Sequence, residues 1–214
     1  MDRTVKGTIA VVIAAAIVGT AVYGTYLPIR KAQSFIATLQ GFQAAPPTSL
    51  SDLETRIAGP LDAPSPIGQE ELVRNVANST LSIIQRGLDA TSTEDLVGFL
   101  NSYYDPILSR GRGMSFGQDL YLEGAVNEIA FAQTGRTNFL EAAKSYYEEG
   151  EKLGPNRPQV LYGLFDIYRA MGDVTNTERV AQKIMMNWPT DTRIQVSLQQ
   201  FLASQASSST KKAK

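Results

Sequence analysis

The chain contains no cysteine and no histidine among its 214 residues. Without cysteine it has no disulfide framework and no thiolate metal site. Without histidine it lacks the commonest general base and the commonest protein metal ligand. We therefore expect no catalytic residue, no metal and no cofactor, and we predict that the protein is not an enzyme.

Basic residues are scarce in the middle of the chain, although the overall net charge is only -1. Seven bases flank an N-terminal apolar segment or close the C-terminal tail: Arg3, Lys6, Arg30, Lys31, Lys211, Lys212 and Lys214. Without these bases and Asp2, the rest of the chain has 13 basic and 20 acidic residues. An acidic body argues against a nucleic-acid partner, because phosphate binding needs a basic stripe. No constellation indicates a small-molecule substrate.

One long apolar run is present, the charge-free segment GTIAVVIAAAIVGTAVYGTYL at residues 7–27. At about 1.5 Å per residue, a helix of this length crosses the roughly 30 Å hydrocarbon core of a bilayer. A cleaved signal peptide is the alternative, but its apolar core is normally about 7–15 residues long and precedes the cleavage site. Here the small residues Ala14, Ala15 and Ala16 fall inside the run. We predict a retained transmembrane anchor over residues 1–28.

The orientation of this span is open on charge alone, because two Lys or Arg residues lie on each side of it. An N-terminal signal anchor most often leaves its short end in the cytoplasm. We therefore expect the C-terminal body to be extracytoplasmic.

The body shows apolar residues at helical spacing, broken by Gly or Pro every 15–25 residues, and no sustained alternation typical of strands. We predict an all-α fold. Residues 29–42 form the first helix of the body, with Pro28 as a possible kink and the break at residues 44–48. A short helix capped by Ser51 ends near Gly59-Pro60.

Two further helices are expected before residue 113. The first has Ser65 as its cap and Pro66 in its first turn, and Gly87 ends it. The second starts in the segment 91–95 and is bent or shortened by Pro106. Gly111 and Gly113 mark the turn that follows. We assign residues 29–113 to a membrane-proximal helical region.

The C-terminal part of the body has a repeat period. Pro155 and Pro189 lie 34 residues apart, the length of the tetratricopeptide helix-turn-helix unit. Small, aromatic and apolar residues stand at the packing positions between and before them. These predicted packing residues are Ala143, Tyr147, Gly150, Pro155, Leu161, Leu164, Tyr168, Gly172 and Pro189.

Over residues 117–204 the chain thus resembles tetratricopeptide repeats. The resemblance implies stacked helix pairs and carries no catalytic residue. Ile194, Leu198, Phe201 and Leu202 share one helical face, as expected of a helix that caps such a stack. We predict repeats and a capping helix over residues 114–204, followed by a disordered basic tail at 205–214.

In stacked repeats the first helix of each pair lines a concave face that binds partner proteins. One stripe of the expected helix after Pro158 is not used for packing: Gln159, Tyr162, Asp166 and Arg169. This stripe is our predicted partner-binding site, and an ordinary solvated helix face is the alternative.

A second resemblance covers more of the body. The segments YLPIRKAQSFIATL, PSPIGQEELVRNVAN and PNRPQVLYGLFDIYRAMGD look like the region after the last membrane helix of some bacterial O-antigen ligase and polymerase-like proteins. That resemblance implies an extracytoplasmic tail at the bacterial cytoplasmic membrane. It leaves open an accessory subunit for envelope glycan assembly, a detached tail, or a gene fragment.

The sequence favours a membrane-anchored, tetratricopeptide-like scaffold for protein interactions at the bacterial cell envelope. Its expected partner is a protein, which could be a multi-span membrane protein. The glycan-assembly subunit is the alternative function.

Overall fold

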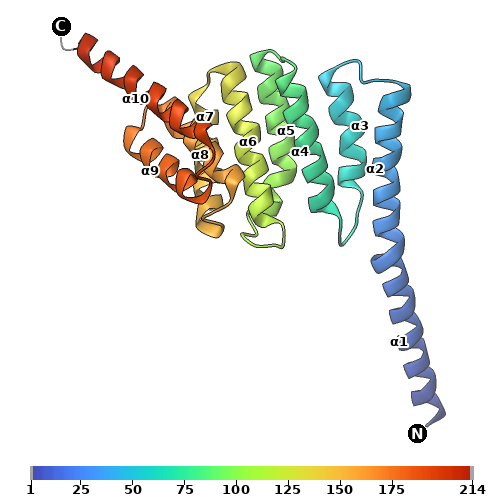
Figure 1. Cartoon of the computed structure of the whole chain (residues 1–214). Coiled ribbons are helices and arrows are strands. Elements are labelled where there is room, and N and C mark those ends of the chain that lie inside the picture. The colour runs from blue at the N-terminus through green and yellow to red at the C-terminus, as the bar shows by residue number, and fades with distance from the viewer. Residues whose placement is uncertain (1, 213–214) are drawn as a thin grey trace. The chain divides into compact units, whose positions relative to one another are not determined.

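A computed structural model describes residues 2–212, and these residues form helices joined by loops, with no strand (Figure 1). The predicted all-α class is therefore confirmed for this part of the chain. The residues group into two compact units, one of residues 1–76 with 99–104 and one of residues 77–98 with 105–214. Because these units cut across two helices, the domain boundaries predicted at 28/29 and 113/114 stay predictions.

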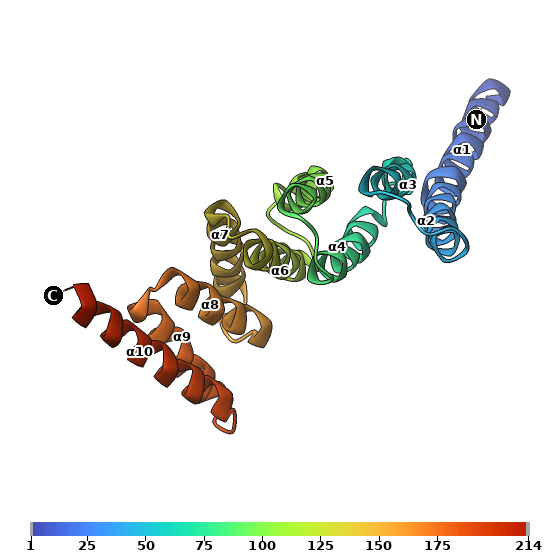
Figure 2. The same ribbon diagram turned by 90° about the horizontal axis from the view of Figure 1, so that it is seen from above.

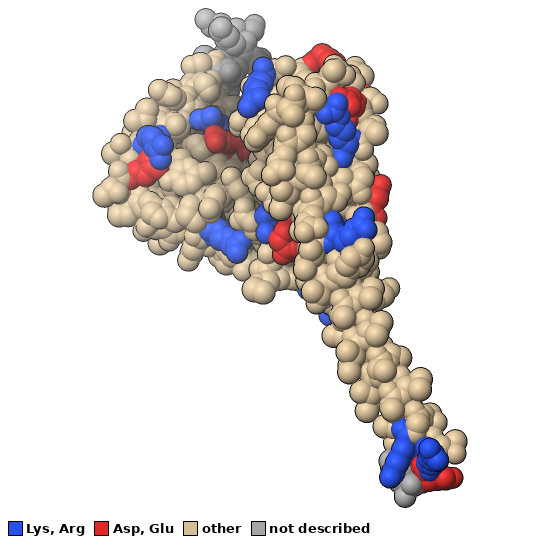
Figure 3. All heavy atoms as spheres, turned by 90° about the vertical axis from the view of Figure 1, so that its right-hand side faces the viewer, with Lys and Arg blue, Asp and Glu red and all other residues tan. Residues whose placement is uncertain are grey.

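The first unit begins with one long apolar helix. Its parts are α1 (Arg3–Ala21), the π-helical turn η1 (Val22–Tyr26) and α2 (Leu27–Ala44). No residue of α1 is buried, and the helix is long and apolar enough to cross a membrane. In Figure 3 the apolar helix carries charged side chains at its free end and then shows none until it reaches the rest of the molecule. These features are those expected of the predicted anchor.

Pro28 does not break this helix, because the turn before it is wider. Within η1 the backbone N–H of Leu27 donates to the carbonyl of Val22, five residues earlier. Proline has no N–H, and its ring collides with the carbonyl four residues back in a regular helix. A π-turn is a common way for a helix to absorb such a local mismatch.

Helix α2 ends at Ala44, as predicted, and α3 follows at Leu50–Asp62. The predicted cap was wrong: the Ser49 hydroxyl, and not that of Ser51, accepts from the backbone N–H of Asp52. The helix also continues through Pro60 instead of ending there. Pro60 lies in the last turn of the helix and is buried.

A buried lysine joins α2 to the end of α3. Lys31 is only 4% exposed. Its ammonium group donates to the backbone carbonyls of Leu61 (2.9 Å) and Ala63 (2.7 Å) and to the side chain of Gln69. The last carbonyls of a helix carry partial negative charge and lack partners within the helix. Lys31 therefore caps α3, and desolvation lowers the pKa of its ammonium.

Helices α4 (Gln69–Gln85) and α5 (Ala90–Leu108) come next, and both starts differ from the prediction. Helix α4 starts after Gly68, whose φ of +89° is not helical. Ser65 and Pro66 therefore lie in the loop before the helix. Helix α5 starts at Ala90 because the Asp89 carboxylate accepts from the N–H of Ser92. It then runs through Pro106 for two residues. The predicted stop near Gly87 is confirmed.

Besides parts of α4 and α5, the described residues of the second unit form α6 (Phe116–Thr134), α7 (Thr137–Leu153), α8 (Pro158–Met171), α9 (Val174–Asn187) and α10 (Thr192–Lys212). From α6 to α10, each helix contacts the next one along the chain, and α6 also contacts α8. Figures 1 and 2 show α9 and α10 side by side. Gly135 and Gly172 have φ of +68° and +72°, the left-handed conformation that ends α6 and α8 at the expected turns.

The predicted packing residues occupy the interior of this unit or its turns. Ala143, Tyr147, Leu161, Leu164 and Tyr168 are buried in one core cluster. Gly150 is also buried, while Pro155 and Pro189 lie in the exposed loops after α7 and α9. Their role as packing positions of a tetratricopeptide repeat stays a prediction. Helix α10 continues to Lys212, through most of the expected disordered tail; Lys214 lies outside the described residues.

The Tyr147 ring of α7 is held between two glycines of neighbouring helices. A Cβ built on Gly124 of α6 would lie 2.5 Å from this ring, and one built on Gly163 of α8 would lie 2.4 Å from it. Because Tyr147 is only 1% exposed, the ring cannot move away from one helix without meeting the other. The spacing of α6, α7 and α8 therefore depends on these three residues.

We predict that Gly163→Ala destabilises the full chain by about 1–3 kcal/mol through this overpacking. The matched control is Gly98→Ala in α5, where a Cβ meets nothing within 4 Å. That substitution should leave stability unchanged or raise it by up to about 1 kcal/mol, since alanine favours helix. Urea unfolding of the detergent-solubilised chain, followed by circular dichroism, measures both. Equal midpoints for the two variants would contradict the packing argument.

Candidate functional site

A hollow of about 300 Å³ opens on the second unit, and three of the four predicted binding residues line it. Gln159, Tyr162 and Asp166 contribute from α8, together with Gly163. They follow one another at three and four residues, so they share one helix face. The fourth predicted residue, Arg169, is not part of this lining.

Helices α6 and α7 supply the remaining lining residues, which are Tyr121, Ala125, Glu128, Ile129 and Tyr147. The Tyr147 hydroxyl donates to Oε2 of Glu128 at 2.7 Å. The rings of Tyr121 and Tyr147 lie with their centroids 6.4 Å apart. The same tyrosine that sets the helix spacing therefore also orients a carboxylate at the hollow.

Two carboxyl groups line the hollow, and burial acts on both. Desolvation raises the pKa of Glu128 to about 7, against the opposing hydrogen bond from Tyr147 and with a smaller contribution from the charge of Asp166. Desolvation also raises the pKa of Asp166, and the nearby Arg169 counters it. A carboxyl group with a pKa near 7 gains a negative charge within the physiological range. A cation bound beside Glu128 would favour that charged form.

Tyr162 connects the hollow to the loop after α9. Its hydroxyl donates to the Asp191 carboxylate, and its ring lies 6.1 Å from that of Trp188. Hydrogen bonds from Arg193 and Tyr162 lower the pKa of Asp191 to about 2. Asp191 is therefore ionised and holds the Tyr162 ring in place. Trp188 is the single tryptophan of the sequence, so its fluorescence reports on this side of the hollow.

Arg169 is engaged within its own helix. Its guanidinium lies 3.2 Å from the Asp166 carboxylate and 5.5 Å from the centroid of the Phe165 ring. These contacts hold it at the edge of the stripe. Arg169 therefore moderates the charge of Asp166 and is not a lining residue.

Sequence reasoning missed Glu128, Tyr121 and Gly163. Glu128 and Tyr121 belong to α6, more than 30 residues before the predicted stripe, and only the packing of α6 on α8 brings them to it. Gly163 had a signal in the sequence. A glycine inside a strongly amphipathic helix indicates that another group comes close to the backbone there.

A second group of acidic residues lies inside the unit. Asp119 and Glu123 are one turn apart on α6 and fully buried. Burial, with the charges of Asp105 and Asp119, raises the pKa of Glu123 to about 8. Among the described residues, no group of three or more acidic side chains is arranged to hold a metal ion. Glu123 is therefore a mainly neutral carboxylic acid at pH 7.

This buried acid predicts a pH-dependent stability. In the unfolded chain Glu123 returns to a pKa near 4.5, so between about pH 5 and 8 the folded state binds the extra proton. Raising the pH through this window should lower the unfolding free energy by about 1–3 kcal/mol. No histidine titrates there, but Glu128, whose pKa is about 7, adds to the same slope. Glu123→Gln should reduce the slope of urea stability against pH, whereas the half-buried control Glu149→Gln should keep it; an unchanged slope in Glu123→Gln contradicts the assignment.

Comparisons with known proteins supply no family for this chain. No family model matches it, and neither a curated protein nor a solved structure matches it. The geometry of the hollow and the apolar helix therefore carry the inference of function.

Proposed function

We propose that this protein is a membrane-anchored scaffold whose tetratricopeptide-like body binds a partner protein at the bacterial cell envelope. The apolar helix tethers the chain, and the body, on the extracytoplasmic side, receives a segment of the partner in the hollow of α6, α7 and α8. The observation that carries the proposal is the convergence of Gln159, Tyr162 and Asp166 with Glu128 and two further tyrosines in that hollow.

The chemistry of the lining favours a basic side chain of the partner. Glu128 and Asp166 supply negative charge, and Tyr121, Tyr147 and Tyr162 supply aromatic surface. Carboxylates attract lysine or arginine, and ring faces add cation–π attraction. The acidic excess of the body draws such a segment by its long-range field.

The size of the hollow fits one inserted side chain better than a whole ligand. Its volume of about 300 Å³ is at the lower end of the range for small-molecule sites, about 300–1,000 Å³. The exposed turn that carries Gln159 offers amide groups to the backbone of an extended segment. A peptide with spaced basic residues is therefore the expected ligand type.

Trp188 fluorescence of the full chain in detergent tests this proposal. A short peptide of alternating lysine and alanine should change the emission, and its glutamate counterpart should not. Asp166→Asn should weaken binding about fivefold or more, the effect of losing roughly 1 kcal/mol of charge attraction. Glu149→Gln, whose carboxylate pairs with Lys152 and does not line the hollow, is the matched control. Equal response to both peptides would refute the proposal.

The same titration has an expected pH dependence. Because the pKa of Glu128 is about 7, its charge increases between pH 6 and 8, and affinity for the lysine peptide should increase with it. Glu128→Gln should remove most of this increase while keeping the fold. Affinity that falls over the same range would contradict the role of Glu128.

A further inference from the structure

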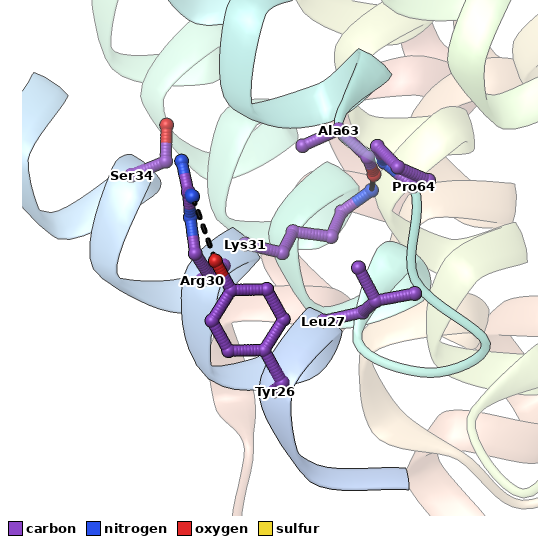
Figure 4. Close-up of a pocket in the computed structure, with 7 residues that line it drawn as sticks. All are labelled: Tyr26, Leu27, Arg30, Lys31, Ser34, Ala63 and Pro64. Atoms are coloured by element: carbon purple, nitrogen blue, oxygen red, sulfur yellow. Dashed lines mark hydrogen bonds between the residues drawn. The ribbon is translucent and has the colours of Figure 1, made fainter. Parts of the chain in front are cut away.

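A second pocket lies in the first unit, at the point where the apolar helix leaves its charge-free segment. It has a volume of about 290 Å³ and is lined by Tyr26, Leu27, Arg30, Lys31, Ser34, Ala63 and Pro64. Figure 4 shows Tyr26 and Arg30 joined by a hydrogen bond and Ser34 next to the guanidinium. The proposed protein-binding hollow is in the other unit and shares no residue with this pocket.

Three polar side chains form one stripe at this pocket, from the last residue of η1 into α2. Tyr26, Arg30 and Ser34 succeed one another at four-residue steps, so they project from the same helix face. The Arg30 guanidinium donates a hydrogen bond to the Tyr26 hydroxyl at 2.9 Å and lies 5.7 Å from the centroid of the Tyr26 ring. This contact fixes the guanidinium at the pocket and uses only part of its five donors.

The pocket carries the positive charges of Arg30 and Lys31, and the nearby Asp62 carboxylate offsets that of Lys31 in part. Among residues 2–207, whose side chains the structure describes, neither Arg30 nor Lys31 forms an ion pair with an acidic side chain. The three donors of Lys31 are used by Leu61, Ala63 and Gln69, so Lys31 contributes charge and not a free donor. Arg30 is exposed and has donors left for an anion.

The position of the stripe defines which anion meets it. Arg30 lies three residues beyond the apolar segment that ends at Leu27, about 4–5 Å along the helix axis. A helix that fills the hydrocarbon core therefore places Arg30 at the level of the lipid phosphates, where arginine and tyrosine side chains reach the headgroups. Leu27, in the same lining, is the last residue of the apolar segment.

We propose that this pocket binds the phosphate of an anionic phospholipid headgroup. The Arg30 guanidinium takes the phosphate oxygens through paired donors, the Tyr26 and Ser34 hydroxyls add hydrogen bonds, and the Lys31 charge stabilises the anion from behind. Arginine is suited to this task because its planar fork matches two phosphate oxygens at once. The bound lipid holds α2, and with it α3, at a fixed height on the membrane.

Native mass spectrometry of the full chain, released from micelles that contain equal phosphatidylglycerol and phosphatidylcholine, tests the proposal. The wild-type chain should retain phosphatidylglycerol about fivefold more often, as one basic contact worth about 1 kcal/mol predicts. Arg30→Gln should abolish this preference. Arg110→Gln, which removes an exposed arginine from the loop after α5, should leave it unchanged.

Two further measurements distinguish a specific phosphate site from nonspecific attraction between a basic side chain and anionic lipid. Arg30→Lys keeps the charge but loses the fork, so it should lose most of the preference; full retention would overturn the proposal. Excess inorganic phosphate should leave the lipid bound. Displacement by inorganic phosphate would identify a soluble anion as the ligand and overturn the lipid assignment, as would equal retention of the two lipids by the wild-type chain.

Discussion

The fit of the Tyr147 ring between Gly124 and Gly163 is the constraint on which the second unit depends. A methyl group on either glycine would come within 2.5 Å of the ring, so these two positions let three helices approach as closely as they do. The closeness has two consequences. It completes the core around Leu161 and Leu164, and it brings the tyrosine hydroxyl to Glu128 at the hollow. Packing and the proposed binding site therefore have the same origin. A substitution that displaces the Tyr147 ring from between the two glycines alters both.

The first unit solves a different problem, the joining of a long apolar helix, able to span a membrane, to the helices that follow it. Lys31 does this by donating to the carbonyls that end α3, so a charge is buried where helix dipoles and amide oxygens compensate for lost water. One turn of π-helix before Pro28 lets the rod continue without a break. Arg30 follows directly and points its charge outward. Each unit thus presents charge of opposite sign to its expected partner: positive toward lipid phosphate, negative toward a basic protein segment.

Helical periodicity and turn glycines were sufficient to predict the all-α class, the apolar helix and the turns at Gly135 and Gly172. Three residues of the predicted binding stripe line the hollow, and their role in binding stays a prediction. The predicted helix starts at Ser51 and Ser65 were wrong because several neighbouring polar residues can cap equally well, and tertiary packing selects among them. Arg169 has the predicted spacing, but its contact with Phe165 and Asp166 is a choice of rotamer that spacing does not encode. Glu128 could not be predicted, since its place at the hollow results from contacts between distant segments.

The most direct measurement of the central claim is site-specific photo-crosslinking on the full chain in lipid nanodiscs. A photoreactive amino acid replaces Gln159 at the hollow or, as control, Met186, which is 83% exposed on α9 and does not line it. The lysine-containing peptide is then added, and adducts are mapped by mass spectrometry. The account predicts adducts from position 159 that high salt suppresses, and few from position 186. Equal yields from the two positions, or adducts from position 186 alone, would contradict it.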